Sequence, residues 1–179
     1  SGATTLELGD SEPVNYPDEI TYAIDYGNNL ISYPFQTSQS IGDGLGDAAT
    51  DIYAVAGAGM AALYAGPELG GEDGWAGSLT SFDGGKGYWL VATNEDGFDF
   101  NFNGHGAVTR SSGQQAVLRA VPEAYSYNQS DQQAFFFVKD ATIGGQALKE
   151  DDLVIAYNGD VVVGSRYWNG KLTDIPAIG

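Results

Sequence analysis

One stretch decides the fold class of this chain: Val154-Ile155-Ala156-Tyr157-Asn158-Gly159-Asp160-Val161-Val162-Val163. Two short runs rich in β-branched residues flank Asn158-Gly159, a pair that favours the positive φ angles of a tight hairpin turn. Comparable runs, bounded by Gly, Asn, Asp or Pro, lie at residues 29–35, 51–55, 86–92, 116–121, 133–138, 153–157 and 161–163. The sequence therefore predicts an all-β sandwich, with helix limited to one short turn within residues 40–49.

Alternation within residues 98–103 predicts how one strand is oriented. Phe98, Phe100 and Phe102 alternate with Asp99, Asn101 and Asn103. Because successive side chains of a strand point to opposite faces, we expect the phenylalanines in the core and the polar residues in water. We further expect Ala56-Gly57 to turn as Asn158-Gly159 does, and Trp89 to lie in the core.

The sequence also contains an internal repeat. Ile41-Gly42, Ala54 and Gly57 recur 102 residues later as Ile143-Gly144, Ala156 and Gly159. Trp75, Gly77, Leu79 and Thr80 recur 93 residues later as Trp168, Gly170, Leu172 and Thr173. The difference of nine residues equals the length of the Gly-rich segment 66–74, which has the composition of a loop insertion. We therefore predict duplicated antiparallel β-sandwich halves: an N-terminal arm or edge strand (1–27), a first β repeat (28–110) and a second β repeat (116–179).

The second copy ends early, and we expect it to lack its last strand. The first copy continues after Leu79-Thr80 into Gly85-Lys86-Gly87-Tyr88-Trp89, whereas the second stops at Gly179, the equivalent of Lys86. An unfinished sheet leaves unpaired backbone groups that another strand can complete. Three sources remain open: residues 4–8 of the same chain, a neighbouring copy, or a continuation of the polypeptide.

Composition excludes several classes of partner. The 179 residues carry 24 acidic and seven basic side chains, a formal charge of −17, which opposes binding to nucleic acid or to an anionic membrane. The sequence contains no run of about 18 apolar residues, so it predicts no membrane-spanning helix. The lack of cysteine removes disulfides, thiolate nucleophiles and zinc-thiolate sites. Dense carboxylates with Gly-rich turns are typical of proteins in calcium-containing media, so we expect an extracellular or cell-surface location.

Motifs for enzymatic chemistry are missing from the sequence. The only histidine, His105, lies between two glycines, and a serine triad would have to use it. No G-x-S-x-G elbow, P-loop, H-E-x-x-H or helix-opening G-x-G-x-x-G is present. We expect no enzyme and no catalytic residue.

Calcium is the one cofactor that the composition favours, because hard oxygen ligands abound and soft ligands are absent. The preferred site is the turn Asn94-Glu95-Asp96 with Asp99 beyond it. No EF-hand spacing or calcium β-roll repeat occurs, and an ordinary solvated acidic surface remains the alternative.

Aromatic side chains and the inserted loop offer a candidate ligand-binding site. Trp75 and Trp168 each begin a W-x-G-x-L-T unit, and Tyr167 precedes the second. Repetition at equivalent positions also fits a packing role on each hairpin. Loops on rigid sheets commonly carry binding, which adds Glu68, Glu72 and Asp73 of segment 66–74.

Two sets of motifs resemble known modules. The first set is Asn29-Leu30-Ile31-Ser32-Tyr33-Pro34, Trp75-x-Gly77-Ser78-Leu79-Thr80 and Gly85-Lys86-Gly87-Tyr88-Trp89. It resembles β-rich modules of large secreted or surface-attached proteins of marine bacteria, including cargo of the type IX secretion route. The second set resembles a companion module of those proteins: Ser130-x-Gln132-Gln133-Ala134-Phe135, Asn158-Gly159-Asp160-Val161 and Asp174-Ile175-Pro176. The resemblance implies adhesion, attachment or spacing, and it carries over no catalytic residues.

Two functions follow as expectations from the sequence. The first is a non-enzymatic extracellular binding or adhesion module, stabilised by calcium if the acidic turn binds it, whose ligand is a carbohydrate or a protein surface. The second is a structural subunit of an extracellular filament, surface layer or particle coat, joined to neighbouring copies of itself by β-strand exchange.

Overall fold

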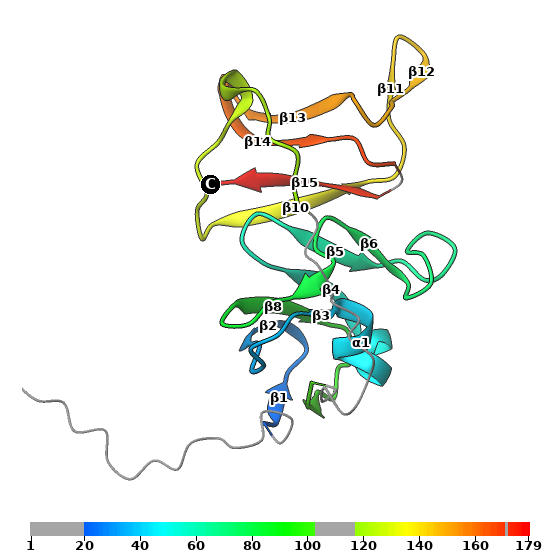
Figure 1. Ribbon diagram of the computed structural model, residues 1–179, viewed down its shortest axis with the longest axis vertical. Coiled ribbons are helices and arrows are strands. Elements are labelled where there is room, and N and C mark those ends of the chain that lie inside the picture. Colours follow the sequence, from blue (N-terminus) through cyan, green and yellow to red (C-terminus); the bar gives the residue numbers. More distant parts are fainter. Residues whose placement is uncertain (1–19, 103–116, 171) are drawn as a thin grey trace, which may run out of the picture.

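The computed structural model of the protein describes residues 20–102, 117–170 and 172–179. Strands dominate, and helix is confined to α1 (Ile41–Leu45) with the short 3-10 segments η2 (Gly46–Asp51) and η3 (Glu123–Tyr125). The all-β class is therefore confirmed, and so is the single helical turn expected near residue 40. Figure 1 shows two β-sheet regions stacked along the long axis of the molecule.

The first region is built on a five-stranded antiparallel sheet. From edge to edge it contains β2 (Gly27–Ser32), β8 (Gly87–Ala92), β4 (Ile52–Ala56), β5 (Ala61–Tyr64) and β6 (Trp75–Gly77). Two small ladders flank it: β1 (Tyr22–Ile24) with β9 (Phe98–Phe100), and β3 (Gln39–Ser40) with β7 (Ser81–Phe82). The part of the arm 1–27 that is described thus includes β1, while residues 4–8 lie outside the described ranges.

Aromatic packing fills the core beneath this sheet. Phe82 is fully buried, and its ring lies 5.6 Å from that of Tyr33, 4.9 Å from Tyr88 and 5.0 Å from Phe102, measured between centroids. Phe100 and Phe102 are buried while Asp99 and Asn101 are exposed, which confirms the alternation expected there, except that Phe98 is only half-buried and Asn103 lies outside the described residues. All members of this core cluster precede residue 103.

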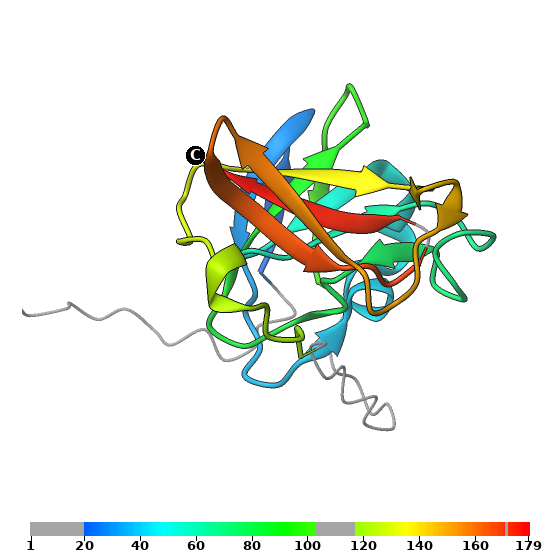
Figure 2. The same cartoon turned by 90° about the horizontal axis from the view of Figure 1, so that it is seen from above.

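The second region contains four longer strands and one small hairpin. The strands are β10 (Gln133–Val138), β13 (Leu153–Asn158), β14 (Val161–Tyr167) and β15 (Thr173–Ile178), and the hairpin joins β11 (Thr142–Ile143) to β12 (Gln146–Ala147). β10 pairs with β15 and β13 with β14, both antiparallel. In Figure 1 the order is β13, β14, β15, β10, with β10 next to the first region, and Figure 2 shows the same layers from above.

Three local expectations need correction. Residues 117–121 form no strand, and Val117 is 92% exposed; the segment meets β14 through side chains, with Arg119 over the ring of Tyr167. The hairpin turn after β13 lies at Gly159-Asp160, one residue later than expected, with Gly159 at φ +60°. The turn after β4 spans residues 57–60, and its positive φ belongs to Gly59 rather than Gly57.

The two repeats agree at one place and differ at others. The hairpins β4–β5 and β13–β14 occupy equivalent positions in the sequence. Residues 41–45 form α1, whereas the equivalent residues 143–147 form the hairpin β11–β12. Trp75 begins strand β6, whereas Trp168 follows the end of β14. The duplication of whole sandwich halves therefore stays a prediction.

Candidate ligand-binding cleft

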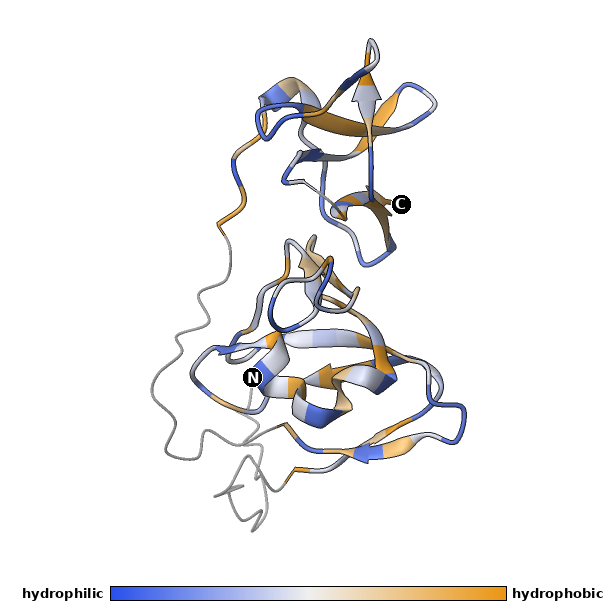
Figure 3. Ribbon diagram, turned by 90° about the vertical axis from the view of Figure 1, so that its right-hand side faces the viewer, coloured by the Kyte–Doolittle hydropathy of each residue, from blue (hydrophilic) through white to orange (hydrophobic). Residues whose placement is uncertain are grey.

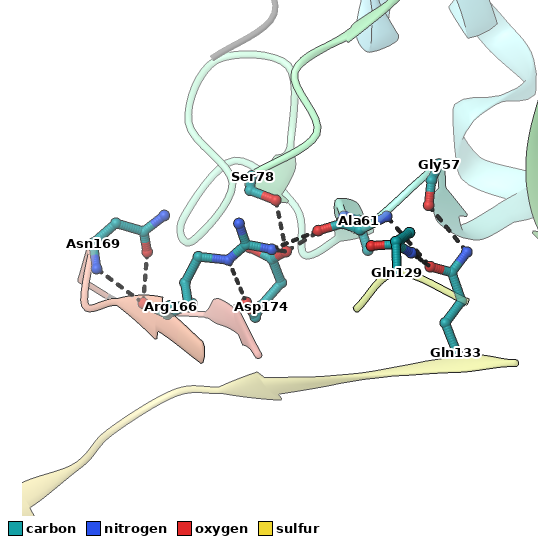
Figure 4. Close-up of polar contacts among 10 residues, drawn as sticks. Gly57, Ala61, Ser78, Gln129, Gln133, Arg166, Asn169 and Asp174 are labelled. Atoms are coloured by element: carbon teal, nitrogen blue, oxygen red, sulfur yellow. Dashed lines mark hydrogen bonds and ion pairs between the residues drawn. The ribbon is translucent and has the colours of Figure 1, made fainter. Parts of the chain in front are cut away.

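A buried carboxylate joins the two regions. Asp174 of β15 is 0% exposed, and its Oδ2 accepts hydrogen bonds from Ser78 Oγ at 2.6 Å, Arg166 Nη2 at 3.1 Å and the Ala61 backbone N at 3.4 Å. Figure 4 shows these groups converging between the regions. Ser78 and Ala61 belong to the first region and Arg166 to the second, so one side chain fixes both.

Burial dominates the electrostatics of this carboxylate. Loss of hydration raises the pKa of Asp174, and the neighbouring Arg166 guanidinium and the Ser78 hydroxyl oppose that rise without cancelling it. The Arg166 guanidinium also donates to the backbone carbonyls of Gly59 at 2.7 Å and Asp174 at 3.1 Å, so backbone acceptors hold it in place. The ion pair lies within the second region, and its hydrogen bonds to Gly59, Ala61 and Ser78 attach it to the first region.

A glutamine forms the second connection, at the other end of the β4–β5 turn. Gln133 Nε2 donates to the Gly57 carbonyl at 3.1 Å, and Gln133 Oε1 accepts from the Gly59 backbone N at 3.3 Å. Gln129 approaches so closely that a Cβ on Gly59 would lie 2.6 Å from its Oε1, and Gly59 has φ +71°. The positive φ favours glycine there, because other residues rarely adopt this backbone angle.

An elongated cleft of ≈ 640 Å³ lies between the sheet of the first region and β10. Its lining is mainly apolar and aromatic: Tyr53, Ala54, Val55, Ala56, Ala61, Leu63, Trp89, Val91, Ala134, Phe135, Phe136, Phe137 and Leu172, with the polar residues Asn28, Asp131 and Gln133. Figure 3 shows the two regions from the side, with the apolar segments of both sheets in orange.

Strand alternation places the β10 side chains on two faces. Gln133, Phe135 and Phe137 share one face of β10, and Gln133 reaches the Gly57–Gly59 turn. Phe135 and Phe137 are half-buried on the face that carries Gln133, whereas Phe136, which also lines the cleft, lies on the opposite face and is 61% exposed.

A β-bulge turns Tyr53 toward the same space. Ile52 pairs with Ala92 and Ala54 with Val91, so Tyr53 is the extra residue of β4. The bulge keeps both Ile52 and Val55 in the core and leaves Tyr53 54% exposed on the outer face. Trp89 lies on this outer face of β8, 41% exposed, between the buried Tyr88 and Leu90.

The exposure of Trp89 corrects the expectation that it lies in the core. Its two neighbours already occupy the core face of β8, and a strand cannot turn three successive side chains inward. Alternation within Tyr88-Trp89-Leu90 was the signal that could have found it. The cleft itself had no such signal, because it depends on how two separate sheets dock.

Of the three predicted aromatic residues, Tyr167 and Trp168 line one pocket, and Trp75 lies outside it. Trp75 and Trp168 are 9% and 7% exposed, as a packing role requires, so neither ring offers an open face. Tyr167 lines a smaller pocket of ≈ 540 Å³, where the Arg119 guanidinium lies 3.9 Å from its ring centroid. Arg119 also pairs with Asp151 at 2.7 Å, so that face of Tyr167 is covered from within the chain.

The acidic residues of the inserted loop lie away from both pockets. Glu68, Glu72 and Asp73 are exposed on segment 66–74, and Asp73 Oδ1 accepts from the Trp75 backbone N at 3.3 Å. The loop therefore forms as expected, and its role in binding stays a prediction.

The residues of the predicted calcium site, Asn94-Glu95-Asp96, form a turn in the structure. Asn94 Oδ1 accepts from the Asp96 backbone N at 3.1 Å, and Glu95, Asp96 and Asp99 are exposed. In the part of the chain that the structure describes, no three metal-ligating His, Asp or Glu side chains gather at one point. Calcium binding at this turn stays a prediction.

Comparisons with protein-family models, curated proteins and solved structures give no match to this chain. Among the described residues, no helix is long and apolar enough to cross a membrane.

Proposed function

We propose that the protein is a non-enzymatic extracellular binding or adhesion module whose ligand lies in the cleft between the first sheet and β10. The observation that carries this proposal is the pair of Trp89 and Tyr53, exposed side chains on a rigid sheet that face the half-buried Phe135 and Phe137. Binding sites are typically apolar and aromatic clefts with a few polar groups, usually formed before the ligand arrives.

The two polar connections support a preformed cleft. Asp174 binds Ser78 just after β6, and Gln133 binds Gly57 in the β4–β5 turn, while the cleft beside these contacts stays open. An apolar surface of this kind commonly marks a binding site. Its ligand class, a carbohydrate or a protein surface, is the one expected from the sequence, and the resemblance to secreted adhesive modules agrees with this proposal.

The experiment is a binding screen against glycans and extracellular proteins, using the full chain. Trp89→Ala and Tyr53→Ala should each abolish the signal of any true ligand, whereas Tyr157→Ala should not, because Tyr157 is 53% exposed on β13 outside the cleft. Ligands bound equally by the wild type and the Trp89→Ala protein would show that the cleft is not the site.

A second function has its own support in the strand edges. Among the residues described, β10 pairs only with β15 and β13 only with β14, so each has an edge open to another strand. A neighbouring copy that added a strand at one of these edges would make the protein a filament or coat subunit. Size-exclusion chromatography over a dilution series should then reveal oligomers, and a monomer at every concentration would exclude this role.

Calcium enters the proposal as a stabiliser at Asn94, Glu95, Asp96 and Asp99. A ligand that binds only the folded state raises the melting temperature. If a chelator leaves the melt unchanged and calcium releases no heat on titration, this part of the proposal is wrong.

A further inference from the structure

We infer that the cleft selects an uncharged polysaccharide chain and rejects acidic polysaccharides and nucleic acid. This inference rests on the proposed function and names the ligand class of the same site.

The shape of the lining suits sugar rings. Trp89 and Tyr53 on the first sheet and Phe135 and Phe137 on β10 provide aromatic surface on two opposite walls. Each hexose or pentose ring has an apolar C–H face that packs on such surface, while its hydroxyl groups point to the side. Asn28 and Asp131 also line the cleft, and both are exposed and able to exchange hydrogen bonds with hydroxyl groups.

Charge decides between neutral and acidic chains. The lining contains no Lys or Arg, and Asp131 is its one side chain that is charged at neutral pH. The whole protein carries a formal charge of −17. A uronate or sulfate group would therefore enter an acidic environment with no cation to pair with, whereas a neutral ring loses nothing to repulsion.

The wall of the cleft that the first sheet forms offers no backbone edge to a peptide strand, whereas β10 on the other wall has one. An added strand needs a row of backbone donors and acceptors along its length. The wall formed by β8 and β4 presents side chains instead, since the backbone groups of these two strands are paired within the five-stranded sheet. A ligand with hydroxyl edges and apolar faces fits that wall better.

Tryptophan fluorescence can report on this site alone. Trp75 and Trp168 are buried, so Trp89 is the tryptophan that acrylamide reaches. We would titrate the full chain with cellohexaose, xylohexaose, mannohexaose and, as the acidic probe, hexagalacturonate. At least one neutral hexasaccharide should change the emission and protect it from acrylamide, and hexagalacturonate should do neither.

Variants of the cleft separate the role of Trp89 as a fluorescent reporter from its contribution to affinity. Trp89→Phe should lose the fluorescence change yet keep calorimetric affinity within a few-fold, while Trp89→Ala and Tyr53→Ala should weaken it roughly tenfold or more. Tyr157→Ala is the matched control, and unchanged melting temperatures would show that the variants fold.

The outcomes distinguish this inference from the function on which it rests. If only the acidic probe or a protein binds, and Trp89→Ala abolishes that binding, the ligand class is wrong while the cleft stands. If a neutral chain binds and neither alanine variant in the cleft affects it, both the inference and the proposed site are wrong.

Discussion

At the scale of single residues, the ion pair between Arg166 and Asp174 carries the largest consequence. Both side chains are buried, at 6% and 0% exposure, and Asp174 also holds Ser78. Removing the cation leaves a carboxylate without water or counter-charge. We predict that Arg166→Met lowers the free energy of unfolding by about 3–5 kcal/mol, measured by urea denaturation.

A second ion pair provides the control. Arg119 and Asp151 are 57% and 90% exposed, and solvent-exposed pairs contribute about 1 kcal/mol or less. Arg119→Met should therefore leave the stability close to that of the wild type. Equal losses in the two variants would show that Arg166 acts through packing rather than through Asp174.

The titration of Asp174 gives a prediction with a definite sign. Because burial raises its pKa in the folded state, the folded protein binds this proton more tightly than the unfolded chain does. The stabilising contribution is complete below the ordinary carboxyl pKa and is lost as the pH rises through the raised value.

Asp174→Asn isolates this group from the other acids, since both proteins share the remaining carboxylates. We predict that the stability of the wild type relative to Asp174→Asn decreases as the pH rises from the ordinary carboxyl pKa to neutrality, as followed by denaturant melts. A relative stability that increases with pH would mean that Arg166 outweighs burial and lowers the pKa.

At the scale of the elements, alternation predicted much of what the structure contains. The strand at residues 133–138 agrees with β10 in full, and those at 86–92 and 51–55 agree with β8 and β4 to within one residue. The bulge at Tyr53 could not be predicted, because it depends on the partner strand β8. Residues 117–121 have strand composition but pair with no strand among the described residues, and composition cannot reveal that.

The candidate site was harder to predict for the same physical reason. Tyr53 and Trp89 come from the first region and Phe135 from the second, and only docking brings them to one cleft. Asp174 lies in a motif that the sequence singled out, Asp174-Ile175-Pro176, yet its partners Ser78 and Ala61 are about a hundred residues away. Sequence reasoning favoured Trp75 and Trp168, whose rings are buried.

Substituting two glycines of the β13–β14 hairpin distinguishes the effect of backbone strain from that of steric overlap. At Gly159 a Cβ meets nothing within 4 Å, so Gly159→Ala adds only the strain of φ +60°, about 1–2 kcal/mol. At Gly164 a Cβ would overlap the backbone carbonyl of Pro176 in β15. We predict that the decrease in melting temperature caused by Gly164→Ala is several-fold larger than that caused by Gly159→Ala. The reason is that β14 must move away from β15 to accommodate the added methyl group. Similar shifts in the two variants would mean that the two strands are not tightly packed.

At the scale of the whole molecule, the apolar core is unevenly distributed. The core cluster lies entirely before residue 103, and the large apolar side chains buried after residue 116, among those described, are Trp168, Leu172, Ile175, Pro176 and Ile178. The buried polar groups Arg166 and Asp174 find part of their hydrogen bonding in Gly59, Ala61 and Ser78. The second region therefore depends on the first for hydrogen-bond partners to its buried charged side chains.

This dependence predicts that the second region does not fold alone. A polypeptide of residues 117–179 would expose Asp174 and Arg166 to water and keep few buried apolar side chains, too few to offset its conformational entropy. We expect an unfolded circular-dichroism spectrum for this fragment and a single calorimetric transition for the full chain, with the calorimetric and van't Hoff enthalpies equal. A folded fragment, or two separate transitions in the full chain, would instead indicate two self-sufficient repeats. The cleft lies between the two regions. If they fold independently, its width would therefore change as the two regions move relative to each other, instead of being fixed by their contacts.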